Sequence, residues 1–304
     1  MANAIFTTKV SPEYDDIPEI RYHFPKTYYR QACEAIGDWI LYYEPRRESH
    51  SPSGHGGRKC YFATAHVRSI ERDPKTENHY YAFVSDYIEF PRPVPFRTGT
   101  TYPERALQKE DGSTNKGRFG RAVRTIPKMD FERILYLGFD DTVPMETEGN
   151  NLLIAAEDPA EYGVPRARIL SERAARDAAF GKTIRGLYGS TCALTGLCII
   201  NGGGACEIEA AHIRPVANEG PDSSRNGLAL CRTVHWLFDR GIVSLDSDGR
   251  ILAANEKLPD QLRGLLNENR TALLPQDPAR RPHPLYLDYH RNVVCKGKDL
   301  RPLS

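Results

Sequence analysis

The segment from Glu207 to Gly241 constrains the fold most, because its pattern changes twice within a short stretch. Polar and apolar residues alternate up to His212, which predicts a strand, and Pro215 cannot continue a strand ladder. The rest of the segment predicts, in order, a turn over Pro221–Ser224, a short strand over Leu228–Leu230 and a helix over Arg232–Arg240 that ends at Gly241. The chain therefore contains a strand, a loop, a second strand and a helix in close succession.

The predicted helix carries two polar side chains on one face. His235 and Asp239 are four residues apart, so both project toward the same point. An imidazole nitrogen and a carboxylate oxygen that converge in this way are suitable ligands for a divalent metal. The spacing therefore predicts a metal site on this helix.

Three motifs in this region resemble the HNH nuclease family. They are Ala-Ala-His212-Ile-x-Pro, Asn226-Gly-Leu-Ala-Leu-Cys and His235-x-x-Phe-Asp-x-Gly, and the resemblance extends from about Leu187 to Ile251. The tail 278–292 also resembles the end of restriction-type members. The resemblance implies a ββα-metal fold and an HNH nuclease domain over residues 166–304.

The resemblance also implies roles for individual residues. His212 is the general base that activates water, and Asn226 holds the loop between the strands. His235 and Asp239 hold a divalent metal, Mg²⁺ or Mn²⁺. Many family members have another metal ligand just before the base, where this chain has Ala211. Glu209 lies two residues earlier on the same strand face, and it is either the missing ligand or a surface carboxylate.

The N-terminal region reads as strand-rich and aromatic. Strands are predicted at Trp39–Tyr43, Tyr61–Val67 and Tyr80–Val84, with a helix over Tyr28–Ile36 that stops at Gly37. Three prolines at 91, 93 and 95 are expected to end the strand region. Residues 141–165 read as a linker, and 169–188 as a helix capped by Ser171. The chain is thus expected to be α+β, with a reader domain over residues 1–140.

The opening of this domain resembles a PUA-superfamily β-barrel of the EVE, ASCH or SRA type. The resemblance rests on Gly37-Asp-Trp-Ile-Leu-Tyr-Tyr43, a loop, and Arg58-Lys-Cys-Tyr-Phe-Ala-Thr-Ala-His-Val67. Fused to an HNH domain, such a barrel implies recognition of modified cytosine, 5-methyl or 5-hydroxymethyl, by base flipping. Candidate pocket residues are Tyr22, Phe24, Tyr28, Trp39, Tyr42, Tyr43 and Asp86. Strand alternation prevents these aromatics from all facing one pocket, and each one is alternatively part of the barrel core.

The net charge of +1 decides nothing about nucleic-acid binding, which must rest on local basic patches. The candidate phosphate-contacting residues are Lys116, Arg118, Arg121, Arg124 and Arg214; the run from 116 to 124 is alternatively a solvated loop. Four cysteines, at 192, 198, 206 and 231, lack the Cys-x-x-Cys spacing typical of structural zinc, so buried free thiols are expected.

Together these features predict a metal-dependent endonuclease that restricts double-stranded DNA carrying modified bases. Two alternatives remain open: an HNH nuclease whose N-terminal domain recognises unmodified sequence, RNA or a small signalling molecule, and a catalytically silent nucleic-acid-binding module. A double-strand break would need two sites, from a homodimer or from two independent arrivals. The sequence shows no signal peptide and no apolar run long enough to span a membrane, so a cytoplasmic protein is expected.

Overall fold

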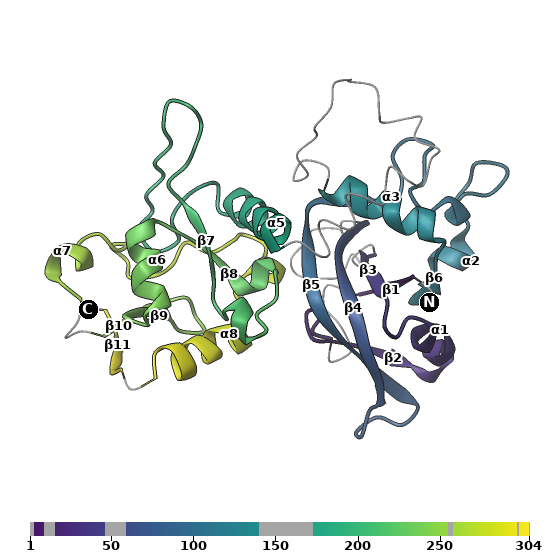
Figure 1. The fold of residues 1–304 in the computed structure, drawn as a ribbon, viewed down its shortest axis with the longest axis horizontal. Coiled ribbons are helices and arrows are strands. Elements are labelled where there is room, and N and C mark those ends of the chain that lie inside the picture. Colours follow the sequence, from purple (N-terminus) through teal and green to yellow (C-terminus); the bar gives the residue numbers. More distant parts are fainter. Residues whose placement is uncertain are drawn as a thin grey trace. The chain divides into compact units, whose positions relative to one another are not determined.

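The computed structural model describes residues 3–8, 16–45, 59–139, 173–254, 258–296 and 298–303. The chain divides into two compact units, Met1–Ala179 and Phe180–Ser304 (Figure 1). The expected linker at 141–165 and the expected helix cap at Ser171 lie outside the described residues. Among the residues described, no helix is both long and apolar enough to cross a membrane.

The first unit is built on a six-stranded sheet. In chain order its strands are β1 (Ala4–Thr7), β2 (Arg21–Pro25), β3 (Trp39–Glu44), β4 (Cys60–Arg72), β5 (His79–Pro95) and β6 (Val123–Thr125). Their order across the sheet is β2-β5-β4-β3-β1-β6. β1 runs parallel to β3, and the other neighbours are antiparallel. The three strands expected from the aromatic runs are all present, as parts of β3, β4 and β5.

The sheet curls strongly about its inner face. Tyr22 on β2 and Phe6 on β1 are far apart in the strand order, yet their ring centroids are 4.8 Å apart. The Tyr22 hydroxyl also donates to the carbonyl of Thr7 at 2.9 Å. Within the described residues β2 and β6 are the edge strands, so side-chain contacts and not a closing ladder join the two ends. The structure is a curled sheet where the sequence suggested a barrel.

The prolines at 91, 93 and 95 do not end the strand region, contrary to expectation, because β5 continues to Pro95. Among the described strands, β2 pairs only with residues 79–83 of β5, so beyond that stretch β5 has one described neighbour, β4. The register there is irregular, with a shift between Tyr61 and Ala63. A strand segment with one open side and a bulge tolerates residues that cannot donate to a ladder.

Helices cover the sheet of the first unit. α1 (Tyr29–Glu34) follows a 3₁₀ turn at Lys26–Tyr28 and is stopped by Gly37, whose φ is +78°, which matches the expected helix and its end. α2 (Lys116–Phe119) is a single short turn, and a further 3₁₀ turn lies at Arg105–Leu107. α3 (Lys128–Phe139) packs Phe131, Ile134 and Leu135 into a core with β5 side chains such as Phe90.

The second unit contains the predicted strand, strand and helix. β7 (Glu209–His212) pairs antiparallel with β8 (Gly227–Leu230), and α6 (Arg232–Asp239) follows directly. α5 (Arg173–Leu187) spans the boundary between the units. The remaining elements are β9 (Val243–Leu245), β10 (Ile251–Ala254), α7 (Asp260–Arg263), α8 (Pro284–Tyr289), a π turn (His290–Val294), β11 (Leu300–Pro302) and 3₁₀ turns at Val216–Asn218, Ser224–Asn226 and Pro278–Arg280.

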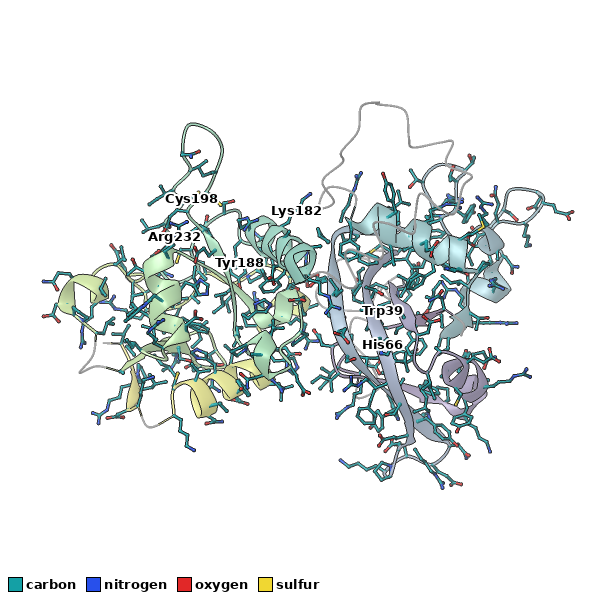
Figure 2. All side chains as sticks on the ribbon, in the orientation of Figure 1. Trp39, His66, Lys182, Tyr188, Cys198 and Arg232 are labelled. Carbon is teal, nitrogen blue, oxygen red and sulfur yellow. The ribbon has the colours of Figure 1, made fainter. Side chains whose placement is uncertain are left out.

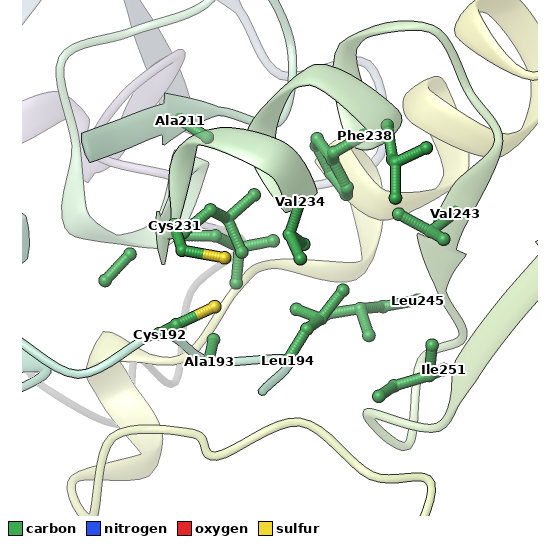
Figure 3. Packing of buried hydrophobic residues seen from close by; sticks show 14 of the residues in the cluster. Cys192, Ala193, Leu194, Ala211, Cys231, Val234, Phe238, Val243, Leu245 and Ile251 are labelled. Atoms are coloured by element: carbon green, nitrogen blue, oxygen red, sulfur yellow. The ribbon is translucent and has the colours of Figure 1, made fainter. Parts of the chain in front are cut away.

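One apolar core holds these elements together. Ala211 of β7, Val234 and Phe238 of α6, and Val243 and Leu245 of β9 lie in it (Figure 3). Val234 and Phe238 are four residues apart and face inward. His235 and Asp239, each one position further on, therefore lie on a face that turns away from the core.

Candidate functional site

His212 lies at the end of β7, opposite Gly227 of β8. One face of its imidazole stacks on the Phe180 ring of α5, with centroids 3.8 Å apart and ring planes 13° apart. The side chain is 16% exposed. A Cβ at Gly227 would meet Ile184 at 2.3 Å, so glycine at this position lets α5 approach β8 closely. The strand end and the helix thus position the imidazole while leaving it in reach of solvent.

The loop after His212 is fastened by Asn226, which is fully buried. Its side-chain oxygen accepts from the backbone N–H of Arg214 at 2.9 Å. Its side-chain nitrogen donates to the carbonyls of Arg214 and Pro221, both at 3.0 Å. The loop also requires Gly220, because a Cβ there would lie 1.8 Å from the Arg214 carbonyl oxygen. Asn226 therefore joins both ends of the loop, which is the arrangement that the resemblance implied.

The same loop brings a carboxylate to His212. Asp222 is 5% exposed, and its Oδ1 lies 2.9 Å from Nε2 of His212. In the sequence, Asp222 appeared only as a turn residue. Nothing in the local pattern indicated that the loop would fold back ten positions, so sequence reasoning missed this contact.

On α6, His235 lies between two carboxylates. Its Nε2 is 3.5 Å from Oδ2 of Asp239, as their spacing predicted. Its Nδ1 is 2.9 Å from Oε2 of Glu209, whose other oxygen accepts from Nε of Arg232 at 3.0 Å. Glu209 and Asp239 are therefore on different ring nitrogens and do not converge on one point.

This geometry tests the fit of a divalent metal. Nε2 of His235 and the Asp239 carboxylate face each other and have suitable donor chemistry, so the two residues fit as a pair of ligands. Glu209 does not face the gap between them. No cluster of three or more His, Cys, Asp or Glu side chains arranged to hold a metal occurs in the described ranges. The metal would thus take two ligands from these residues.

The cysteines do not form one cluster of equivalent residues. Cys192 and Cys231 are buried in the core and their sulfurs point toward each other (Figure 3), whereas Cys198 is exposed and Cys206 is half-buried. A hydrogen bond from the Cys231 thiol lowers the pKa of Cys192 to about 6. All seven cysteines are free thiols.

The proposed reader residues separate into two groups. Tyr22, Phe24, Tyr42 and Tyr43 are at most 3% exposed and lie in the cores of the first unit, which is the alternative that the sequence left open for each of them. Tyr28 packs against the core that contains Tyr22, Phe24 and Tyr42. Trp39 and Asp86 remain accessible, although Trp39 also packs against the core that contains Tyr43.

Two further side chains, His66 and Arg176, lie beside Trp39, and Arg176 connects it to Asp86. Trp39 and His66 lie on the sheet of the first unit (Figure 2). The ring of Trp39 is edge-on to that of His66 on β4, with centroids 5.7 Å apart. Nη1 of Arg176 donates to Asp86 at 3.1 Å, and the Arg176 guanidinium carbon is 6.0 Å from the centre of the Trp39 ring. Burial acts to raise the pKa of Asp86, but hydrogen bonds from Arg176 and from Ser85 outweigh it and lower the pKa. The sequence did not indicate His66 or Arg176.

The candidate phosphate contacts also separate. Lys116 and Arg121 are exposed. Arg124 is 2% exposed and binds the buried Glu104 through Nη2 at 3.0 Å, so its predicted phosphate contact is wrong for this structure. Arg118 reaches the same carboxylate at 3.3 Å. The buried Glu104 carboxylate requires positive partners, and this requirement takes Arg124 out of the basic surface, whereas Arg118 stays 30% exposed.

Arg214, in the second unit, is also engaged by its neighbours. Its Nε donates to the carbonyl of Asn218 at 2.6 Å, and its guanidinium lies over the Tyr289 ring at 5.0 Å. It remains a quarter exposed.

The arrangement is thus a strand that ends in a held histidine, followed by a second strand and a helix that carries a histidine and a carboxylate. Residues 192–246 match the HNH_2 family model, described as HNH endonuclease. The chain therefore contains an HNH endonuclease domain and is a nuclease.

Solved structures similar to the chain include two restriction enzymes. The "Modification dependent TagI restriction endonuclease" is 16% identical with a TM-score of 0.30, over 95% of this chain and 80% of that one. The "Type IV phosphorothioation-dependent restriction endonuclease ScoMcrA" is 14% identical with a TM-score of 0.20, over 77% of this chain and 48% of that one. At TM-scores this low we take no function from either. Comparison with curated proteins finds no match.

Proposed function

We propose that this nuclease is a divalent-metal-dependent DNA endonuclease that acts on DNA carrying modified bases. One observation carries the nuclease part. Glu209, three residues before His212 on the same strand, is bound to His235, so the candidate base and the candidate metal ligands belong to one rigid assembly. Phosphodiester hydrolysis needs these two components together.

The residues divide the chemistry as follows. His212 takes a proton from water, so that the water can attack phosphorus. His235 and Asp239 hold Mg²⁺ or Mn²⁺, which supplies positive charge to the phosphate and to the leaving oxygen. Asn226 keeps the loop beside His212 in place. Two such sites are needed for a double-strand break, either in a homodimer or through two arrivals.

A cleavage assay tests this assignment. The full chain should cut DNA with Mg²⁺ or Mn²⁺ and stop when EDTA is added. His212→Ala should lower the rate by about 10²-fold or more while DNA binding persists, because general-base catalysis contributes about 10²- to 10⁴-fold. His79→Ala, in the other unit, is the matched control. A His212→Ala protein that is folded and cleaves at the wild-type rate would refute the proposal.

For recognition of the modified base, Trp39 and Asp86 support the proposal better than the buried tyrosines do. A flipped base needs an aromatic surface for stacking and a carboxylate that accepts from the cytosine amino group. Trp39 of β3 is half-buried beside His66 of β4, and Asp86 is exposed on β5, the next strand beyond β4. The planar guanidinium of Arg176 already makes both kinds of contact, since it lies near the Trp39 ring and donates to the Asp86 carboxylate. We assign these side chains to the modified-cytosine site.

Binding titrations on matched methylated, hydroxymethylated and plain duplexes test this specificity. With the His212→Ala chain as a non-cleaving background, modified DNA should bind more tightly, and Trp39→Ala should remove the difference. Tyr29→Ala changes an exposed aromatic outside the cluster and should keep it. Raised salt should weaken all binding while the preference persists. Equal affinity of the unmutated reader for all three duplexes would leave a nuclease whose first unit recognises something else.

A further inference from the structure

We infer that Asp222 is a positioning residue that sets the His212 imidazole as a proton acceptor at Nδ1. The inference rests on the proposed role of His212 as general base. It concerns which ring nitrogen accepts the proton from water and which residues hold the ring. Asp222 lies in neither of the motifs that identify His212 and Asn226.

The His212 ring is held at one edge and on one face. Asp222 Oδ1 and His212 Nε2 are 2.9 Å apart, while Phe180 covers one ring face at 3.8 Å. The carboxylate fixes the ring edge and the phenyl group fixes the ring plane, so rotation about either side-chain torsion would lose a contact. In the described part of the chain, Nδ1 of His212 has no hydrogen-bond partner. Nδ1 is therefore the nitrogen that remains open for water.

Asp222 is itself held in place by its neighbours in the loop. Asn226 donates to the carbonyl of Pro221, the residue immediately before Asp222, at 3.0 Å. The next two residues, Ser223 and Ser224, are buried. Asn226 can therefore act on the base through Asp222, because it fixes the peptide from which the carboxylate projects. This gives a physical route from the buried asparagine to the imidazole.

The chemistry follows from the pairing. A carboxylate is an acceptor, so it favours the neutral imidazole that carries its proton on Nε2 and its lone pair on Nδ1. When water transfers a proton to Nδ1, an O–H bond breaks, an N–H bond forms and hydroxide is left to attack phosphorus. The imidazolium that results stands beside the Asp222 carboxylate, which stabilises its charge. An asparagine can turn its amide to donate to Nε2, which would favour the wrong tautomer.

The first test uses ¹⁵N-histidine NMR on the full, metal-free chain, with His212→Ala to assign the signal among nine histidines. We expect the wild-type His212 to be the Nε2–H tautomer and Asp222→Asn to lose that preference. This measurement requires neither metal nor activity. A wild-type His212 protonated on Nδ1 would overturn the inference, whatever the variants do.

The second test is kinetic. Asp222→Asn should lower kcat by about 10²- to 10⁴-fold with little change in KM, and Asp222→Glu should restore part of the rate. Asp248→Asn makes the same chemical change in an exposed turn and should have no effect. If Asp222→Asn is folded and fully active while His212→Ala is inactive, only this inference fails. If His212→Ala is active too, the proposed nuclease site itself is wrong.

Discussion

Glu209 binds Nδ1 of His235 at 2.9 Å, on the opposite ring nitrogen from the one that faces Asp239. The sequence suggested Glu209 as a replacement for the metal ligand missing at Ala211. The geometry instead favours a carboxylate that orients a candidate metal ligand, an arrangement that fixes the tautomer of such a histidine and raises its basicity as a ligand.

Calorimetry with Mn²⁺ should distinguish these two roles. His235→Ala and Asp239→Ala should each abolish binding, because each removes one of two protein donors. Glu209→Ala should weaken affinity by about 10- to 100-fold, the usual effect of losing an orienting partner. Glu268→Ala, an exposed carboxylate elsewhere in the unit, serves as the control. Unchanged affinity in both His235→Ala and Asp239→Ala would contradict the metal assignment.

The ion pair between Glu104 and Arg124 should support stability more than DNA binding. Arg124→Ala leaves a fully buried carboxylate short of its closest cation and should cost about 3–5 kcal/mol of unfolding free energy. Arg121→Ala, on the exposed part of the same run, should leave stability unchanged and weaken DNA binding. Urea unfolding and a binding titration on both variants measure this. A stable Arg124→Ala protein with weakened DNA affinity would favour the phosphate contact.

Gly220→Ala should loosen the loop beside His212. The added methyl group would lie 1.8 Å from a backbone oxygen, so the loop must move, at a cost of about 1–3 kcal/mol. The Arg214 amide, which donates to Asn226, should then exchange its hydrogen faster, and cleavage should slow. Gly202→Ala has open space around the new Cβ and should do neither. Unaltered exchange at Arg214 in the Gly220→Ala protein would show that the loop tolerates the change.

His290 should make the second unit less stable in acid. Burial lowers its pKa to about 4, since the ring is enclosed and stacks on the Phe238 ring, and Lys298 and Arg291 act in the same direction. The hydrogen bond to the Phe238 carbonyl at 3.0 Å acts to raise the pKa and is outweighed. The folded pKa is below the ordinary 6.5, so the unfolded chain binds the proton first. The contribution to stability is full above pH 6.5 and is lost as pH falls toward 4, by an amount on the order of 3 kcal/mol.

Unfolding titrations at several pH values, comparing wild type with His290→Gln, check this prediction. The glutamine variant should be less stable at neutral pH but should lose less stability on acidification. His283→Gln is a useful comparison, because burial also lowers the pKa of His283 to about 4, although its side chain is less enclosed. Parallel pH profiles for wild type and His290→Gln would remove His290 as the source.

Local sequence pattern alone determined much of the candidate nuclease site. Alternation ended β7 at His212, helical spacing put His235 and Asp239 on one face of α6, and Gly37 and Gly241 marked helix ends. These features follow from the periods of strands and helices and from backbone freedom, all of which act over a few residues. The same short range explains why the strands at 39–43, 61–67 and 80–84 could be predicted.

Only the tertiary structure decided which side chains meet across the chain. The loop that returns Asp222 to His212, the placement of Glu209 on Nδ1 of His235 and the burial of Arg124 against Glu104 all depend on chain closure over ten to twenty-six residues. No local period encodes such contacts, because they are selected by the need to satisfy buried polar groups within a particular packing. Composition and spacing therefore located the candidate chemistry, whereas packing decided which of its residues face a substrate and which hold the fold.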